Sequence, residues 1–339
     1  MLGVAAALIG LFLHNVDLRH VAADIVRARP AWLAISLSTM FLNLAIRTLR
    51  WRYLLEPLGP TSFASAFRAT AVGFAASSVL PARAGEVIRP YFLARQTKHD
   101  AASHVTATGA FATIVLERLM DVVTVLTLLA LYVFVSGRDL AHTNPALFAA
   151  LTWAGGTAAV GSLIGLVVLF LLAGDPERVG RVLRRFERSG PSALAGLVAR
   201  TAETFLRGLG VIRRPSRLLV ALAWSFPLWL TIATGIWAGS RAFDFAIPFT
   251  GTFLLVALLV IGVAVPTPGA IGGFHEMFRI GTTLVYGVPD DAAVGAAIVL
   301  HLFSIGPALG LGLYFAAQEG LNLGGMRQLA DQAEQGRTA

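Results

Sequence analysis

The feature that most constrains this chain is a series of long apolar runs. A helix needs about 20 apolar residues to cross the ~30 Å hydrocarbon core of a bilayer, and backbone groups in lipid must satisfy their own hydrogen bonds. The sequence therefore predicts an all-α, polytopic membrane bundle. The runs that carry this prediction cover residues 31–46, 103–135, 146–173, 218–238, 249–265 and 292–317.

Composition excludes a water-soluble fold. Of the 339 residues, 56% are hydrophobic and only 14% are charged, whereas soluble domains keep roughly a quarter of their residues charged. There are no cysteines, which excludes disulfides and Cys-ligated metals. The formal net charge is +8, but the arginines gather at helix ends and in one loop. We therefore predict contact with anionic lipid and no binding of nucleic acid.

The arginine distribution orients the helices. Residues 174–217 form the longest polar stretch, and the positive-inside rule places this loop in the cytoplasm. Its arginines recur at helical spacing between apolar residues, which predicts an amphipathic helix on the inner leaflet, with a solvated linker as the alternative. We divide the chain into a transmembrane domain, residues 1–318, and a short tail, residues 319–339, with both termini cytoplasmic.

Tracing the chain outward from that loop predicts six spans, the first within residues 1–13, and two re-entrant hairpins; eight plain spans are the alternative. Both ends of the segment 63–80 are predicted to lie on the cytoplasmic side of the membrane. The segment 249–287 contains prolines and glycines that interrupt a straight helix. The two broken segments resemble each other, which indicates an inverted repeat of the transporter type or chance similarity. The predicted hinges are Pro81, Gly85, Pro266, Pro268, Gly269 and Gly272.

Charged residues within apolar runs mark the candidate site, because a charge in the membrane costs several kcal/mol unless it is paired or hydrated. Glu117 and Asp121 share one helix face with Thr113 and Thr124, and Arg118 lies beside them. This polar stripe predicts either a ligand site or an ion-pair network that only joins helices.

A second charged group follows the proline–glycine break of the first hairpin. Arg83, Glu86 and Arg89 flank a predicted helix start, where free N–H groups and guanidinium groups together attract phosphate. Positive-inside anchoring is the alternative, although it leaves the embedded Glu86 unexplained. The full set of predicted head-group contacts is Arg83, Glu86, Arg89, Glu117, Arg118, Asp121 and Glu276.

Three residues at the inner end of the second apolar run, Arg47, Arg50 and Trp51, predict an interface anchor, since tryptophan and arginine are enriched at the membrane–water boundary. Contact with a ligand is the alternative. The pair His275-Glu276 lacks a second histidine four residues after the first, so we reject a protease zinc site. We predict no catalytic residues, no metal and no cofactor.

Four motifs in order resemble the lysylphosphatidylglycerol synthase transmembrane, or flippase-like, family, over roughly residues 1–318. In the multiple peptide resistance factors such a domain precedes a soluble lysyl-transferase domain and is held to flip the aminoacylated lipid. Similar standalone chains accompany glycosyltransferase or hopanoid pathways. The motifs are Arg47…Arg50-Trp51, Pro81-x-Arg83-x-Gly85-Glu86-x-x-Arg89, Glu117-Arg118-x-x-Asp121 and Pro266-x-Pro268-Gly269-x-x-Gly272-x-x-x-Glu276.

The resemblance implies lipid handling, and the short stretch after the last predicted span leads us to expect no transferase domain. We therefore expect a translocase or head-group transporter for a phospholipid or polyprenyl-linked lipid in the cell (inner) membrane. A membrane-embedded lipid transferase and a non-catalytic partner subunit remain the alternatives. Expected partners are a membrane lipid and a lipid-modifying enzyme or glycosyltransferase.

Overall fold

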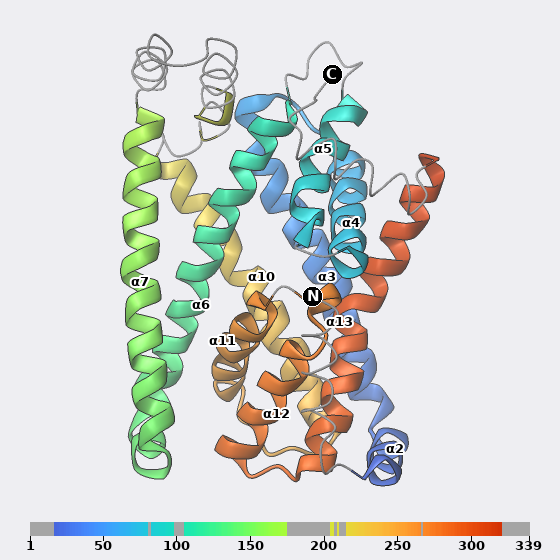
Figure 1. Cartoon of the computed structure of the whole chain (residues 1–339), viewed down its shortest axis with the longest axis vertical. Helices are drawn as coiled ribbons and strands as arrows, with labels where there is room; N and C mark the ends of the chain where they lie inside the picture. Colours follow the sequence, from blue (N-terminus) through green and yellow to red (C-terminus); the bar gives the residue numbers. More distant parts are fainter. Residues whose placement is uncertain are drawn as a thin grey trace.

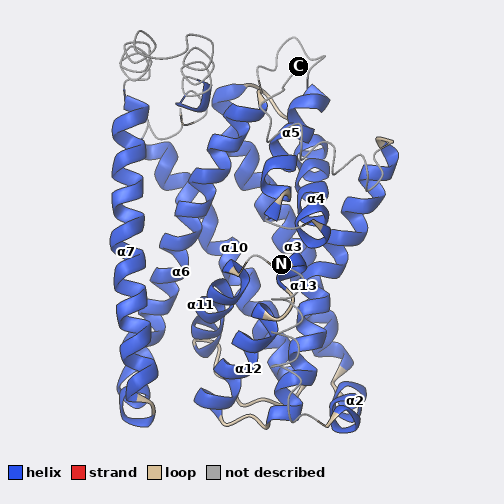
Figure 2. Ribbon diagram, in the orientation of Figure 1, coloured by secondary structure: helices blue, strands red, loops and turns tan. Residues whose placement is uncertain are grey.

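The computed structural model describes residues 17–80, 83–97, 105–174, 204–206, 209, 215–265 and 267–320. Within these ranges the chain is helical and contains no strand, as Figure 2 shows. The longest helices run roughly alongside one another from end to end of the bundle (Figure 1). The predicted all-α membrane bundle is confirmed.

Five helices in the described part of the chain are long and apolar enough to cross a membrane, which makes this a multi-pass membrane protein. The sixth predicted span falls on residues 1–13, which lie outside the described residues, as do most of the predicted amphipathic loop and the tail. The spanning helices are α3 (Pro30–Leu55), α6 (Ala107–Thr143), α7 (Pro145–Gly174), α10 (Pro215–Ala242) and α13 (Asp290–Gln318).

The first broken segment is a pair of short helices, α4 (Phe63–Val79) and α5 (Gly85–Thr97), which pack side by side. With 17 and 13 residues they are about 26 and 20 Å long, less than the ~30 Å thickness of the hydrocarbon core. Small residues allow the close contact, because a Cβ on Gly85 would overlap the carbonyl oxygen of Gly73. The segment 63–80 is therefore one leg of a helical hairpin, and α5 is the other.

The second broken segment forms a matching pair, α11 (Gly251–Ala264) and α12 (Gly273–Tyr286), joined through the short 3-10 turn η3 (Pro268–Ala270). Its two helices also pack together through glycine, since a Cβ on Gly273 would overlap the Gly262 carbonyl oxygen. Figure 1 shows this hairpin in the opposite half of the bundle from α4 and α5. The tip of the second hairpin, η3, contacts α4, so the two hairpins meet inside the protein.

Spanning helices clamp the two hairpins in place. Helix α13 packs closely along α4, where Gly312 lies against the backbone of Ala71, and it also contacts α12. Helix α3 packs along α10, with the Ser36 hydroxyl donating to the Gly235 carbonyl oxygen at 2.8 Å. The amphipathic helix α2 (Leu18–Arg27) contacts α13. These contacts fix where the hairpin tips lie relative to the charged face of α6.

Candidate functional site

The site is built around Arg50 of α3, whose side chain is completely buried. Its Nη1 donates to Asp121 Oδ1 at 2.6 Å and to the Ser225 hydroxyl at 2.8 Å. Its Nη2 lies 3.4 Å from Glu117 Oε1. Helices α3, α6 and α10 are therefore joined at one buried guanidinium, which holds two carboxylates that would otherwise be strongly unfavourable in a membrane interior.

The first hairpin enters the same network through Arg89 of α5. Arg89 Nη1 donates to the second oxygen of Glu117 at 2.8 Å. Its guanidinium carbon lies 3.7 Å from the ring centroid of Trp51, a close cation–π contact. The Trp51 indole N–H in turn donates to the Thr113 hydroxyl at 3.0 Å. Arg50, Arg89 and Glu117 thus form an inner layer of short, buried contacts.

Asp121 connects this inner layer to an outer one. The indole N–H of Trp229 donates to Asp121 Oδ1 at 3.0 Å. Two further arginines approach the other carboxylate oxygen at longer distances, Arg118 at 3.5 Å and Arg47 at 4.0 Å. These are weak contacts compared with the 2.6 Å bond from Arg50, so the outer arginines are held loosely by the protein itself.

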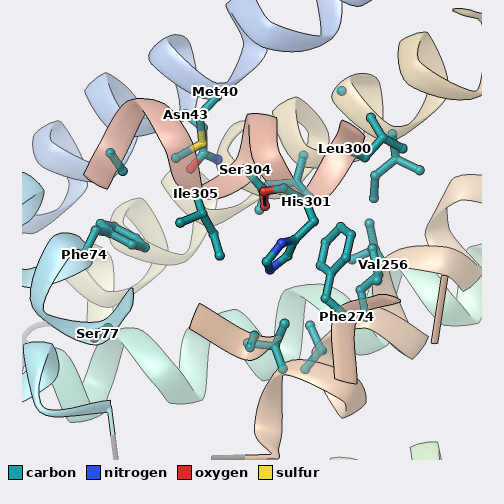
Figure 3. Close-up of a pocket in the computed structure, with 18 of the residues that line it drawn as sticks. Met40, Asn43, Phe74, Ser77, Val256, Phe274, Leu300, His301, Ser304 and Ile305 are labelled. Carbon is teal, nitrogen blue, oxygen red and sulfur yellow. Dashed lines mark hydrogen bonds between the residues drawn. The ribbon is translucent and has the colours of Figure 1, made fainter. Parts of the chain in front are cut away.

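The outer layer faces a cavity of about 650 Å³, which is within the usual size range of ligand pockets. Figure 3 shows side chains from several helices turned toward this space, with the His301 ring beside Phe274 and with Asn43 and Phe74 on other walls. Most of the lining is apolar. The charged residues that line it are Arg47, Arg83, Glu86, Arg118 and Asp121.

Both hairpin tips border this cavity. Ser77 and Ser78 come from the end of α4, and Gly269 comes from η3. Both tips contain a residue with left-handed backbone dihedrals, with φ of 56° at Arg83 and 60° at Gly269. For residues other than glycine this conformation costs on the order of 1–3 kcal/mol. The His301 Nε2–H of α13 donates to the Gly269 carbonyl oxygen at 2.8 Å, which secures the second tip.

Positive charge exceeds negative charge in this cluster. Five arginines stand beside three carboxylates, so the described cluster carries two positive charges in excess. Within the described residues, five buried arginine nitrogens of the cluster have no hydrogen-bond partner, and one buried carboxylate oxygen, Asp121 Oδ2, has none either. The nitrogens are Arg47 Nε, Arg50 Nε, Arg89 Nε, Arg89 Nη2 and Arg118 Nε. Such donors are costly in a membrane protein unless something accepts from them, so the arrangement suits an anion.

Comparison with known proteins agrees with this architecture. Residues 1–312 match the family model described as the lysylphosphatidylglycerol synthase TM region. The chain belongs to this family. The match covers nearly the whole chain and confirms the resemblance drawn from the four short motifs. Among curated proteins, none matches the chain.

For this member of the lysylphosphatidylglycerol synthase TM family, the structure unites most of the predicted site. The polar stripe is confirmed, since Thr113, Glu117, Asp121 and Thr124 are all buried on α6. Glu86 lies 3.8 Å from Arg83 and 3.9 Å from Arg118, so charges of the first hairpin and of α6 meet. The residues that come together are Arg83, Glu86, Arg89, Glu117, Arg118 and Asp121.

Glu276 is not brought to this cluster. It lies on α12 with Arg279 at 3.5 Å, and Arg279 also contacts Asp290 at 3.1 Å. Glu276 is not among the residues that line the cavity. The second hairpin therefore does not supply the carboxylate that was expected from its sequence.

The interface-anchor prediction for Arg47, Arg50 and Trp51 is wrong. Arg50 and Trp51 are 0% exposed and Arg47 is 6% exposed, whereas an anchor has to reach lipid head groups. Each has a partner inside the bundle: Asp121 for both arginines and Thr113 for the tryptophan. Helix α3 turns this face toward α6, and only the tertiary packing reveals that orientation.

The predicted hinges divide into two groups. Pro81 and Pro266 lie outside the described residues. Gly269 and Gly272 have φ of 60° and 88°, a conformation that favours glycine, and Pro268 begins η3. Gly85 provides close helix contact. Movement at any of these positions stays a prediction.

Sequence reasoning missed the polar partners that come from α10. Ser225 and Trp229 contact Arg50 and Asp121 from more than 100 residues away in the chain. They stand four residues apart in an apolar helix and thus share a face, but a serine and a tryptophan are common enough in membrane helices that this spacing alone carries no prediction.

Proposed function

We propose that this protein binds the head group of a membrane lipid, a phospholipid or a polyprenyl-linked lipid, in the central cavity and moves that lipid between the leaflets. The observation that carries the proposal is the pair Arg47 and Arg118, which present incompletely bonded guanidinium groups to a cavity inside the bundle. Guanidinium binds phosphate in a planar, bidentate manner that no apolar wall provides.

The two hairpins support movement as well as binding. They occupy opposite halves of the bundle (Figure 1), and residues of both hairpins line the cavity. Interrupted helices of opposite orientation around a central site are the arrangement found in many alternating-access transporters. Displacing one hairpin at a time would open the cavity toward one leaflet at a time.

The positive-inside rule supports an orientation for this cycle. The end of the bundle where α5, α7 and α13 terminate adjoins the arginine-rich sequence between 174 and 217, so we place this end in the cytoplasm of the cell (inner) membrane. The first hairpin would then gate the cytoplasmic side and the second hairpin the external side.

The test is lipid translocation in reconstituted vesicles. Purified full-length protein in liposomes that contain a fluorescent phospholipid should increase the fraction bleached by an external membrane-impermeant reductant. The double variant Arg47→Gln, Arg118→Gln should reduce the translocation rate at least about tenfold, the factor expected for a loss of 1.4 kcal/mol. Arg118 is partly exposed, so its removal need not unfold the protein.

A matched control is Arg27→Gln, which removes one positive charge from an exposed position on α2, away from the cavity. It should translocate lipid at the original rate. If the cavity double variant stays folded by size-exclusion chromatography and still moves lipid at the original rate, the proposed function is incorrect.

A further inference from the structure

Each carboxylate of the site lies beside arginines, and this restricts which lipid the cavity accepts. Glu117 is held by Arg89 at 2.8 Å and Asp121 Oδ1 by Arg50 at 2.6 Å, whereas Asp121 Oδ2 has no hydrogen-bond partner among the described residues. Glu86 has arginine nitrogens at 3.8 and 3.9 Å. An ammonium group entering the cavity would therefore compete with arginines for every carboxylate that lines it.

The arginines of the outer layer make only long contacts with these carboxylates. Arg47 meets a carboxylate only at 4.0 Å, and its Nε has no hydrogen-bond partner among the described residues. Arg118 Nε is likewise buried and without a hydrogen bond in that part of the chain. The cavity wall thus offers donors and positive charge in excess, which favours an acceptor that carries negative charge.

The rest of the polar lining is neutral and presents acceptors. The hydroxyls of Thr39, Ser78 and Ser304 each donate to a carbonyl oxygen of their own helix, at 2.6 to 2.9 Å. Their hydrogens are therefore used, and their lone pairs remain to accept hydrogen bonds from a ligand. Neutral acceptors of this kind suit the hydroxyl groups of a glycerol or a sugar.

We infer that the cavity selects an anionic lipid and disfavours an aminoacylated lipid that is net cationic. The anionic lipid either has an uncharged, hydroxyl-bearing group on its phosphate or ends in the phosphate itself. This inference rests on the proposed function and names its substrate class. Lysylphosphatidylglycerol, the lipid in the family description, carries two amines on one phosphate and is net cationic. The excess positive charge around Arg47 and Arg118 would repel it in a low-dielectric site.

Competition binding tests the inference directly. The full-length protein, in nanodiscs of zwitterionic phosphatidylcholine, is loaded with a fluorescent phosphatidylglycerol, which is then displaced by unlabelled phosphatidylglycerol, a polyprenyl phosphate or lysylphosphatidylglycerol. We expect either anionic lipid to compete at least about tenfold better than lysylphosphatidylglycerol. The ratio of the two anionic competitors identifies which source of phosphate the cavity prefers.

Charge variants show whether the cavity arginines set this preference. Arg118→Gln should reduce the advantage of the anionic lipids by about tenfold, and Arg118→Lys, which keeps the charge, should retain most of it. Arg27→Gln removes the same charge outside the cavity and should leave the ratio unchanged. A fall in the ratio that occurs equally in Arg27→Gln would mean that general surface charge sets the preference and would overturn the inference.

The outcomes separate the inference from the proposed function. If lysylphosphatidylglycerol competes as well as the anionic lipids and Arg118→Gln weakens all of them, the cavity binds head groups but the charge selection is wrong. If no lipid displaces the probe in a saturable way, both the selection and the proposed function fail. Preference for anionic lipid that depends on Arg118 supports both.

Discussion

The hairpins α4–α5 and α11–α12 share a shape but not a chemistry. In each, two short helices meet through a glycine pair, Gly73 with Gly85 and Gly262 with Gly273. The first brings Arg89 into the buried cluster at 2.8 Å from Glu117. The first leg of the second carries no charged residue, and Arg279 of its second leg pairs with Glu276 of the same helix and with Asp290 of α13.

The difference separates two requirements of the fold. Close packing of two short helices needs only a missing Cβ, so both hairpins can use the same glycine device. Charge in the interior needs partners on neighbouring helices, and only the first hairpin lies against the carboxylates of α6. The two hairpins therefore provide the shape of the site, and one of them provides the charge.

The largest effect should come from removing Arg50, the central cation of the buried cluster that the first hairpin contacts. Arg50→Met leaves Asp121 and Glu117 buried with fewer partners, so we expect the free energy of unfolding to fall by about 3–5 kcal/mol. Asp290→Asn, at the start of α13, removes the partly exposed pair with Arg279 of the second hairpin and should cost at most about 1 kcal/mol. Denaturant titration in detergent measures both; equal losses would contradict the contrast in chemistry.

An intermediate effect should appear in both hairpins alike. Gly85→Ala and Gly273→Ala each place a methyl group on a backbone carbonyl of the paired helix, and each should destabilise the protein by about 1–3 kcal/mol. Gly310→Ala is the matched control, because a Cβ there meets nothing within 4 Å. Thermal unfolding followed by circular dichroism provides the comparison. If only one hairpin is sensitive, the two are not structural equivalents.

The smallest effect should come from the tip of the second hairpin. His301→Phe removes the hydrogen bond to the Gly269 carbonyl oxygen and should lower the free energy of unfolding by about 0.5–1.5 kcal/mol. Ser304→Ala, whose hydroxyl bonds only within its own helix, should change it by less than about 0.5 kcal/mol. If His301→Phe lowers the free energy of unfolding as much as Gly273→Ala does, the hydrogen bond at the tip stabilises the fold as strongly as the helix packing, contrary to this prediction.

Much of this arrangement was predictable and some was not. The break near residue 81 and the breakers from 266 onward predicted two half-depth hairpins, because proline and glycine interrupt helices locally. The stripe on α6 was also predictable from helical spacing. Arg50 and Trp51 were misplaced at the membrane surface because arginine and tryptophan are typical of both a membrane interface and a buried ion pair, and local sequence does not distinguish them.

By itself, the sequence determined the membrane class, the helical runs and the positions of the breaks, because hydrophobicity, length and backbone propensity are properties of neighbouring residues. The tertiary structure alone decided which charges meet. Arg50 reaches Asp121 across 71 residues and Ser225 across 175, and Glu276 stays apart from them all. Such pairings depend on how each helix is rotated about its axis, which packing against the neighbouring helices sets.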